Sequence, residues 1–157
     1  MTYDRQKTVE YARRWAYGRN PDYYIFDDMG GDCTNFASQS IYAGAGVMNF
    51  DPDDGWYYLS LNQRSPSWAG VEFLMKFLTE NRGPGPYAVV SPLEDAEPGD
   101  IIFLSFSGKR FEHSTIVISN NNGDIRIAAH TYDNFNRPLS TYEYSDSRLL
   151  HIEGVNP

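Results

Sequence analysis

The run Gly30-Gly31-Asp32-Cys33-Thr34-Asn35-Phe36 holds the only cysteine in the 157 residues of this chain. Its two glycines predict a tight turn, and Asp32 is a residue type that caps helices at the N-terminus. Apolar residues follow at helical spacing, which predicts a helix from Cys33 to about Gly44. Cys33 would then occupy the first helical position, where unpaired N–H groups and the helix dipole favour the nucleophilic thiolate over the thiol.

A cysteine that has no disulfide partner can also be an ordinary core residue, because free cysteines are among the most buried residue types. The neighbours Asp32, Thr34 and Asn35 are polar, however, and they favour a reactive thiol. We expect Asp32 and Asn35 to brace the turn, with contact to a substrate as their alternative role.

The composition is that of a single globular domain over residues 1–157, with 41% hydrophobic and 22% charged residues. A net charge of −8, with no basic cluster longer than Arg13-Arg14, argues against a nucleic-acid partner. The chain has neither an apolar run of membrane-spanning length nor a secretion signal at its N-terminus. We therefore expect a monomer without a nucleic-acid, membrane or cofactor partner, which can be one domain of a longer protein.

Helical periodicity fills the first half of the chain and strand patterns fill the second. Helices are predicted over about 4–17, 33–44 and 67–78, and the segment 83–86 (Gly-Pro-Gly-Pro) ends the last of them. Strands are predicted over 101–104, 113–118, 125–130, 139–144 and 148–152. Helices followed by strands indicate an α+β fold, in which N-terminal helices pack on an antiparallel sheet of about five to six strands.

The hairpin formed by 113–118 and 125–130 predicts which histidines lie together. Isoleucines alternate along both strands, and burial favours a register in which they face each other across the ladder. The resulting pairs are Ile116 with Ile127 and Ile118 with Ile125. The same register sets His113 opposite His130 on the other face. A cysteine nucleophile needs an imidazole, and that imidazole needs an orienting partner, so we expect both histidines to serve Cys33.

Four motifs follow one another along the chain in an order that is typical of one enzyme family. They are Gly-Gly-Asp-Cys-Thr-Asn-Phe (30–36), Pro-Gly-Asp-Ile-Ile-Phe (98–103), His-Ser-Thr-Ile-Val-Ile (113–118) and Ala-His-Thr-Tyr-Asp (129–133). Together they resemble the bacterial amidase domains of the papain-like NlpC/P60 superfamily, which is related to the CHAP domains. The stretches 3–5, 19–23 and 64–68 are similar to the same family, so the resemblance covers nearly the whole chain.

The resemblance implies a papain-like fold and a cysteine hydrolase that cleaves amide bonds, often in the peptides of cell-wall peptidoglycan. It implies that Cys33 is the nucleophile and His113 the general base of a catalytic triad. His130 matches the third member, and Asp133 is the alternative for that role. Tyr23 matches a tyrosine whose hydroxyl helps the backbone N–H of Cys33 to hold the oxyanion. The implied location is outside the cell or in the cell wall of a bacterium, within a longer secreted or phage-derived protein.

Two alternative functions remain open from the residues alone. Cys33, His113 and His130 could bind zinc with a water as fourth ligand, although no close ligand spacing supports such a site. The twelve tyrosines could instead make the chain a carbohydrate-binding or wall-binding module without catalysis.

Four further assignments concern single residues or short loops. Trp56 and Trp68 could wall a substrate groove or belong to the core. The acidic segment 51–54 could hold calcium, although such loops are usually only solvated. We expect His151, near the C-terminus, to be structural.

Overall fold

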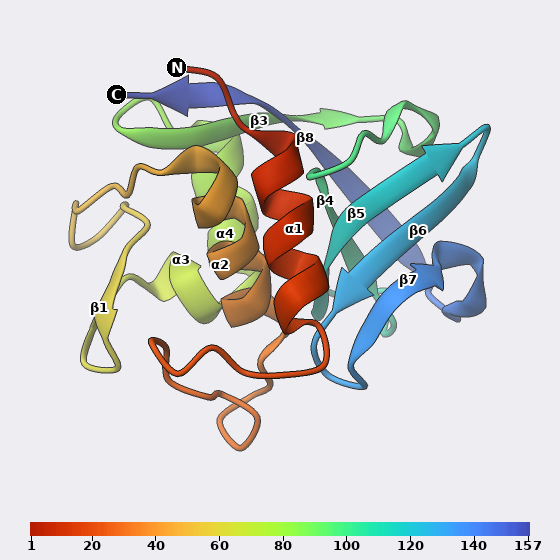
Figure 1. Ribbon diagram of the computed structural model, residues 1–157, viewed down its shortest axis with the longest axis horizontal. Coiled ribbons are helices and arrows are strands. Elements are labelled where there is room, and N and C mark those ends of the chain that lie inside the picture. Colours follow the sequence, from red (N-terminus) through yellow and green to blue (C-terminus); the bar gives the residue numbers. More distant parts are fainter.

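The first half of the chain forms helices that cover one face of a sheet built mainly from the second half (Figure 1). The structure is a computed structural model and describes residues 1–157. Its helices are α1 (Arg5–Trp15), α2 (Cys33–Ala45), α3 (Pro66–Ala69) and α4 (Val71–Glu80). None of them is long and apolar enough to cross a membrane. The expected α+β architecture is confirmed, and α1 and α2 lie where the periodicity predicts them.

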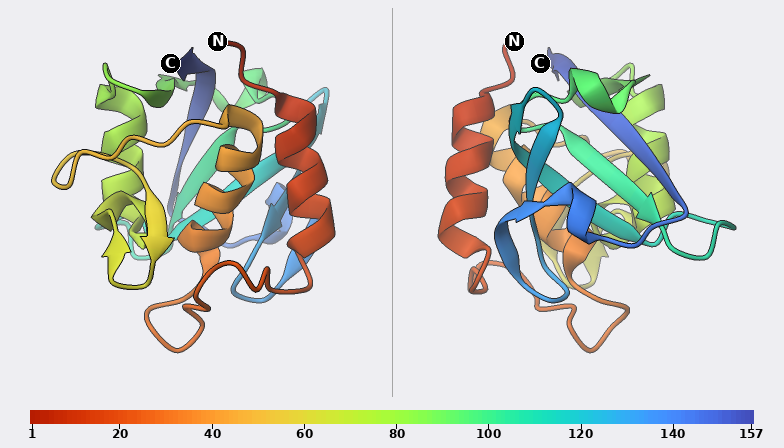
Figure 2. Two further views of the ribbon diagram at one scale, coloured as in Figure 1. Left: turned by 60° about the vertical axis from the view of Figure 1, so that its left-hand side comes forward. Right: turned by 90° about the vertical axis from the view of Figure 1, so that its right-hand side faces the viewer.

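Six strands form the main sheet in the order β3-β8-β4-β5-β6-β7, and all neighbours are antiparallel. Their bounds are β3 (Gly85–Ser91), β4 (Ile101–Ser105), β5 (His113–Asn121), β6 (Asp124–Ala129), β7 (Asn134–Pro138) and β8 (Asp146–Asn156). A separate hairpin consists of β1 (Tyr58–Ser60) and β2 (Gln63–Arg64). Figure 2 shows the helical layer and the twisted sheet from two further sides. The predicted antiparallel sheet is confirmed.

Three elements differ from the predicted ones. The strand expected over 139–144 is instead the 3-10 helix η2 (Leu139–Thr141) followed by irregular backbone, and Pro138, which has no N–H to donate, is the last residue of β7 before it. The third predicted helix is divided at Gly70 into α3 and α4. The segment expected to end that helix opens β3, since Gly85 adopts a left-handed φ of +104° and β8 supplies a long pairing partner.

The main sheet is buried on both faces. A cluster of 23 buried residues lies between the helices and the sheet, and Phe36, Trp56 and Trp68 belong to it. A second cluster of nine residues, which includes Val117 and Ile127, lies on the opposite face. Trp56 and Trp68 have no exposed surface, so they are core residues and do not wall a substrate groove.

The predicted register of the β5–β6 hairpin is wrong by one residue. Ile116 pairs with Ala128 rather than with Ile127. Ile116 faces the helices, whereas Ile127 faces the second cluster. Because both faces are apolar, either one accommodates an isoleucine, and the hydrophobic pattern leaves the register unspecified. His113 and His130 therefore do not lie opposite each other.

Helices α1 and α2 approach each other closely at Gly44. The backbone N–H of Asp4 donates to the Gly44 carbonyl oxygen at 2.9 Å, and the Asp4 side chain caps α1 by accepting from the Lys7 N–H. A Cβ atom at position 44 would overlap Thr8 Oγ1 and the Asp4 carbonyl oxygen. The absence of a side chain there sets the distance between α1 and α2.

The fully buried carboxylate of Asp100 ties α1 to β8. It accepts a hydrogen bond from Arg5 Nη1 at 2.7 Å and another from the Ile152 N–H at 3.0 Å. His151 Nδ1 lies 3.0 Å from the same carboxylate, in keeping with the expected structural role of this histidine. The two termini consequently lie side by side (Figure 1).

Candidate functional site

Four element ends meet at one end of the molecule. They are the C-terminal end of α1, the first turn of α2, the start of β5 and the end of β6, and the segment 16–32 lies across them (Figure 1). Cys33, His113 and His130 all belong to this end, as the sequence predicts.

Cys33 is the first residue of α2 and is only 7% exposed. Its sulfur lies 3.7 Å from Thr34 Oγ1, which in turn lies 2.9 Å from Ser114 Oγ. Ser114 is the residue after His113, so these two contacts join the start of α2 to the start of β5. Burial raises the pKa of the Cys33 thiol and outweighs the opposite effect of the hydrogen bonds from Ser114 and Thr34. The prediction that Cys33 is a thiolate is therefore wrong, because the buried thiol keeps its proton at pH 7.

His113 begins β5 and is 5% exposed. Its ring lies between those of Phe106 and Tyr142, with centroid distances of 6.2 and 5.6 Å. Burial lowers the pKa of His113 to about 4, and the nearby positive charge of Arg137 acts in the same direction. The imidazole is thus neutral at pH 7 and can accept a proton from a thiol.

His130 is engaged elsewhere and does not orient His113. Its Nδ1 lies 2.6 Å from Asp32 Oδ2, and its Nε2 lies 2.8 Å from the Trp15 carbonyl oxygen. Its ring stacks on Phe36 of α2 with a centroid distance of 4.1 Å. His130 therefore joins α1, the start of α2 and the end of β6, and its predicted place in the triad is not supported by these contacts.

Asp32 is buried and ionised. Burial by itself would raise its pKa, but hydrogen bonds from His130, Asn35 Nδ2 and the Phe26 N–H outweigh that effect and hold the pKa below its ordinary value. Its side chain caps no N–H of α2. Asn35 accepts in turn from Trp68 Nε1 at 3.0 Å. Asp32 and Asn35 are each 1% exposed and brace the turn, so the alternative of substrate contact does not apply here.

Asp133 is bound by Arg19, which the sequence does not single out as a site residue. Arg19 donates to it in a bidentate arrangement, with distances of 3.0 and 3.1 Å, and forms a second bidentate pair with Asp27. Arg19 Nε also lies 3.6 Å from the Asp32 carboxylate. Asp133 is therefore part of a charged network around the 16–32 segment and does not orient His113. The sequence does not show that these three aspartates surround one arginine, because Asp133 lies far along the chain from Asp27 and Asp32.

The Tyr23 ring packs against Tyr58 and Trp68, with centroid distances of 5.0 and 6.0 Å. Burial raises the pKa of Tyr23 to about 12, so its hydroxyl keeps its proton and can donate a hydrogen bond. Its role at the oxyanion stays a prediction.

The residues do not form a metal centre. No group of three or more His, Cys, Asp and Glu side chains is arranged to hold a metal ion. His130 is turned toward Asp32 and Trp15, which contradicts the zinc site with Cys33 and His113. The Asp51 carboxylate accepts from the N–H groups of Asp53 and Asp54, each at 2.9 Å, so it serves to close the 51–54 turn.

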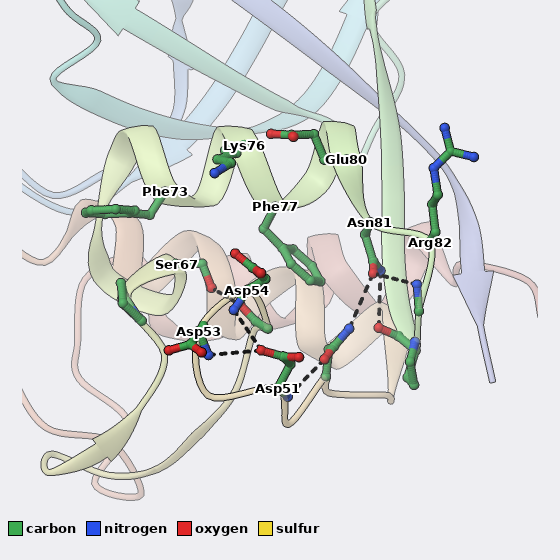
Figure 3. Close-up of a pocket in the computed structure, with 15 residues that line it drawn as sticks. Asp51, Asp53, Asp54, Ser67, Phe73, Lys76, Phe77, Glu80, Asn81 and Arg82 are labelled. Atoms are coloured by element: carbon green, nitrogen blue, oxygen red, sulfur yellow. Dashed lines mark hydrogen bonds between the residues drawn. The ribbon is translucent and has the colours of Figure 1, made fainter.

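Three cavities of the molecule lie away from Cys33. One of about 640 Å³ lies between the 51–55 turn and α4 and is lined mainly by polar and charged residues, among them Asp53, Asp54, Lys76 and Glu80 (Figure 3). Two others, of about 900 and 400 Å³, border α1 and α3. None of the three is lined by Cys33 or His113.

A cysteine at the start of a helix, joined through Thr34 and Ser114 to the strand that begins with a neutral histidine, is an arrangement from which a thiol hydrolase can be built. The chain belongs to the family described as Putative amidase domain, whose profile matches residues 2–152. The name of this family points to hydrolysis of amide bonds.

Two proteins of Bacillus subtilis (strain 168) are similar to this chain. The uncharacterized protein YhbB is 38% identical over 150 residues, which cover 92% of this chain and 46% of that protein. The uncharacterized protein YjcM is 20% identical over 161 residues, covering 98% of this chain and 37% of that protein. The chain thus spans less than half the length of either relative. No solved structure matches it, and the assignment to the NlpC/P60 superfamily stays a prediction.

Proposed function

We propose that this chain is a cysteine hydrolase that cleaves amide bonds, with Cys33 as the nucleophile and His113 as the general base. The observation that carries the proposal is the contact chain from the Cys33 sulfur to Thr34 Oγ1 and on to Ser114 Oγ, which joins the start of α2 to the residue after a neutral, buried histidine. Membership of the amidase family supports the reaction class.

The neutral state of both groups determines how the reaction begins. As the sulfur attacks the amide carbonyl carbon, the thiol proton passes to His113, and the carbonyl oxygen becomes an oxyanion. The backbone N–H of Cys33, at the start of α2, stabilises this charge by about 3 kcal/mol if it acts like measured donors elsewhere. The His113 imidazolium then gives its proton to the leaving amine. A water activated by His113 finally hydrolyses the thioester and regenerates the thiol.

Asp32 and His130 support this chemistry without touching the substrate. The Asp32 carboxylate holds His130, and His130 holds the Trp15 carbonyl and the Phe36 ring. These contacts place the first turn of α2 against β6 and therefore place Cys33 against β5. Tyr23 and the Cys33 N–H remain the proposed oxyanion donors.

For the substrate we propose peptide amide bonds of bacterial peptidoglycan, and for the location the cell wall or the outside of a bacterium. The family resemblance supports this proposal. Amidase and endopeptidase activities need the same thiol chemistry, so both belong to the proposal.

The test compares the wild type with Cys33→Ala and Cys33→Ser on a defined muropeptide, with products identified by mass spectrometry. We expect the wild type to release one new amine, and both variants to lose at least about 10³-fold in kcat/KM. Iodoacetamide should abolish the wild-type activity irreversibly. A Cys33→Ala protein with full cleavage activity would refute the proposal, and wall binding without cleavage by the wild type would favour a binding module.

A further inference from the structure

Two enclosed polar atoms near Cys33 have no hydrogen-bond partner in the protein. They are Nε2 of His113 and the hydroxyl oxygen of Tyr142, and no other buried side-chain nitrogen or oxygen is in this position. Buried polar groups are nearly always paired, so each unpaired atom calls for a functional explanation. That both belong to rings in contact, with centroids 5.6 Å apart, suggests one explanation for the two.

The two atoms are chemically complementary. A neutral imidazole carries a proton on one nitrogen and a lone pair on the other, and a phenol oxygen accepts as well as donates. If Nε2 carries the proton and donates to Tyr142, Nδ1 keeps the lone pair that must take the thiol proton. Hydrogen bonds of catalytic groups are often long without substrate and tighten when it binds.

The residues expected to orient His113 are committed to other partners. His130 binds Asp32 and the Trp15 carbonyl, and Asp133 binds Arg19 through both carboxylate oxygens. The Tyr142 hydroxyl, by contrast, has no hydrogen-bond partner within the protein. Burial raises the pKa of Tyr142 and outweighs the opposite effects of the neighbouring Arg137 and Asn134 side chains, so Tyr142 keeps its hydroxyl proton. It is therefore the polar side chain best placed to hold His113.

The Tyr142 ring is itself held in place. The Arg137 guanidinium lies 3.6 Å from its centroid, and Arg137 Nε donates to Thr141 Oγ1 at 2.7 Å. The ring also packs against the second apolar cluster, on the same face as Val117 of β5. A ring supported on two sides can fix the orientation of the imidazole that it touches.

We propose that Tyr142 is the positioning residue of His113, with Nε2–H of the imidazole donating to the Tyr142 hydroxyl oxygen. The inference rests on the proposed function and deepens it, because Tyr142 takes the place of His130 and Asp133 as the third member of the Cys-His site. In the sequence Tyr142 lies in a segment predicted as a strand, so nothing in the pattern singles it out.

The test uses Tyr142→Phe, which removes one oxygen and keeps the ring that stacks under Arg137. The matched control is Tyr144→Phe, because Tyr144 is half-buried and packs against the same cluster. We expect kcat/KM on the muropeptide to fall by about 10- to 100-fold for Tyr142→Phe, as for the loss of a hydrogen bond to a charged group. We expect a change of less than about 2-fold for Tyr144→Phe.

The second readout is the tautomer of His113, measured by NMR on protein with ¹⁵N-labelled histidine. We expect the Nε2–H tautomer in the wild type and a mixture of tautomers in Tyr142→Phe. A dominant Nδ1–H tautomer in the wild type would overturn the inference without any variant. The inference would also be overturned if Tyr142→Phe and Tyr144→Phe had the same His113 tautomer and the same kcat/KM.

The two proposals fail in distinguishable ways. If Cys33→Ala keeps its activity, the hydrolase mechanism fails, whatever the tautomer shows. If Cys33→Ala is inactive while Tyr142→Phe behaves like its control, only the role of Tyr142 fails.

Discussion

Burial acts in opposite directions on the two residues proposed to react. It raises the pKa of the Cys33 thiol and lowers the pKa of the His113 imidazole to about 4. Both groups are consequently neutral at pH 7, so the resting site is a thiol and an imidazole rather than an ion pair. The thiol loses its proton only when the sulfur attacks, and His113 must be unprotonated at that moment.

This state predicts an unusually acidic limit to activity. Since His113 is a base only when neutral, kcat/KM should stay level as the pH falls from 7 to 5 and should decline with a midpoint near 4, the pKa of His113. The measurement is a pH profile of kcat/KM, with circular dichroism at each pH to confirm the folded state. A midpoint near 6.5 would show that the ring is solvated in the working enzyme.

The buried Asp32–His130 pair predicts a stability effect. Asp32→Asn should lower the free energy of unfolding by about 3 kcal/mol at pH 7, as when one partner of a buried pair is removed. The Asp32 carboxylate stabilises the folded state at pH values above its ordinary pKa of 3.8. This stabilisation is lost as the pH falls through the lower pKa that Asp32 has in the folded protein. Urea unfolding at pH 7 and pH 3 measures it.

The matched control is Asp27→Asn, because Asp27 binds Arg19 with a side chain that is 42% exposed. We expect that substitution to cost less than about 1 kcal/mol. Equal losses for the two variants would mean that the buried pair contributes no more than a surface pair.

At the scale of elements, α2 does most to organise the site. It presents Cys33 from its first turn, and its other end touches α1 at Gly44. The bounds of α2 follow from the sequence, because the glycine turn and helical spacing mark its start. The crossing of α1 and α2 does not follow from the sequence, because nothing in the sequence shows that Gly44 lies against Thr8.

Gly44→Ala should therefore destabilise the protein by at least about 2 kcal/mol, because the new methyl group would collide with Thr8 Oγ1 and the Asp4 backbone. Gly18→Ala is the control, since the nearest atom to its Cβ would be Trp15 Cε3 at an ordinary 3.7 Å. Thermal unfolding of both variants checks the prediction. Near-equal midpoints would show that the helices can separate without loss.

At the scale of the whole molecule, a sheet that is buried on both faces holds the site together. A cluster of 23 buried residues lies between the helices and one face, and a second cluster of nine lies on the other. His130 stacks on Phe36 of α2, whereas His113 contacts Phe106 and Tyr142, so the two histidines have different partners. The ends of the chain are joined beside this core by Arg5 and Asp100.

Arg5→Met should cost about 2 kcal/mol, since it leaves the buried Asp100 carboxylate without its ion pair and frees the Ile152 carbonyl oxygen. Arg13→Met is the control, because Arg13 and its partner Glu10 are both more than half exposed. Chemical unfolding with a constant m-value is the measurement. If the two variants lose the same stability, the link between α1 and β8 is unimportant.

The sequence by itself determined the helices α1 and α2, most strands, the antiparallel sheet and the placing of Cys33 at a helix start. These features depend on local spacing, turn residues and caps, which neighbouring residues encode. The tertiary structure alone decided the β5–β6 register, the partners of His130 and the contact between His113 and Tyr142. These depend on which face of a doubly buried sheet each side chain occupies, and an apolar pattern that suits both faces carries no information about that choice.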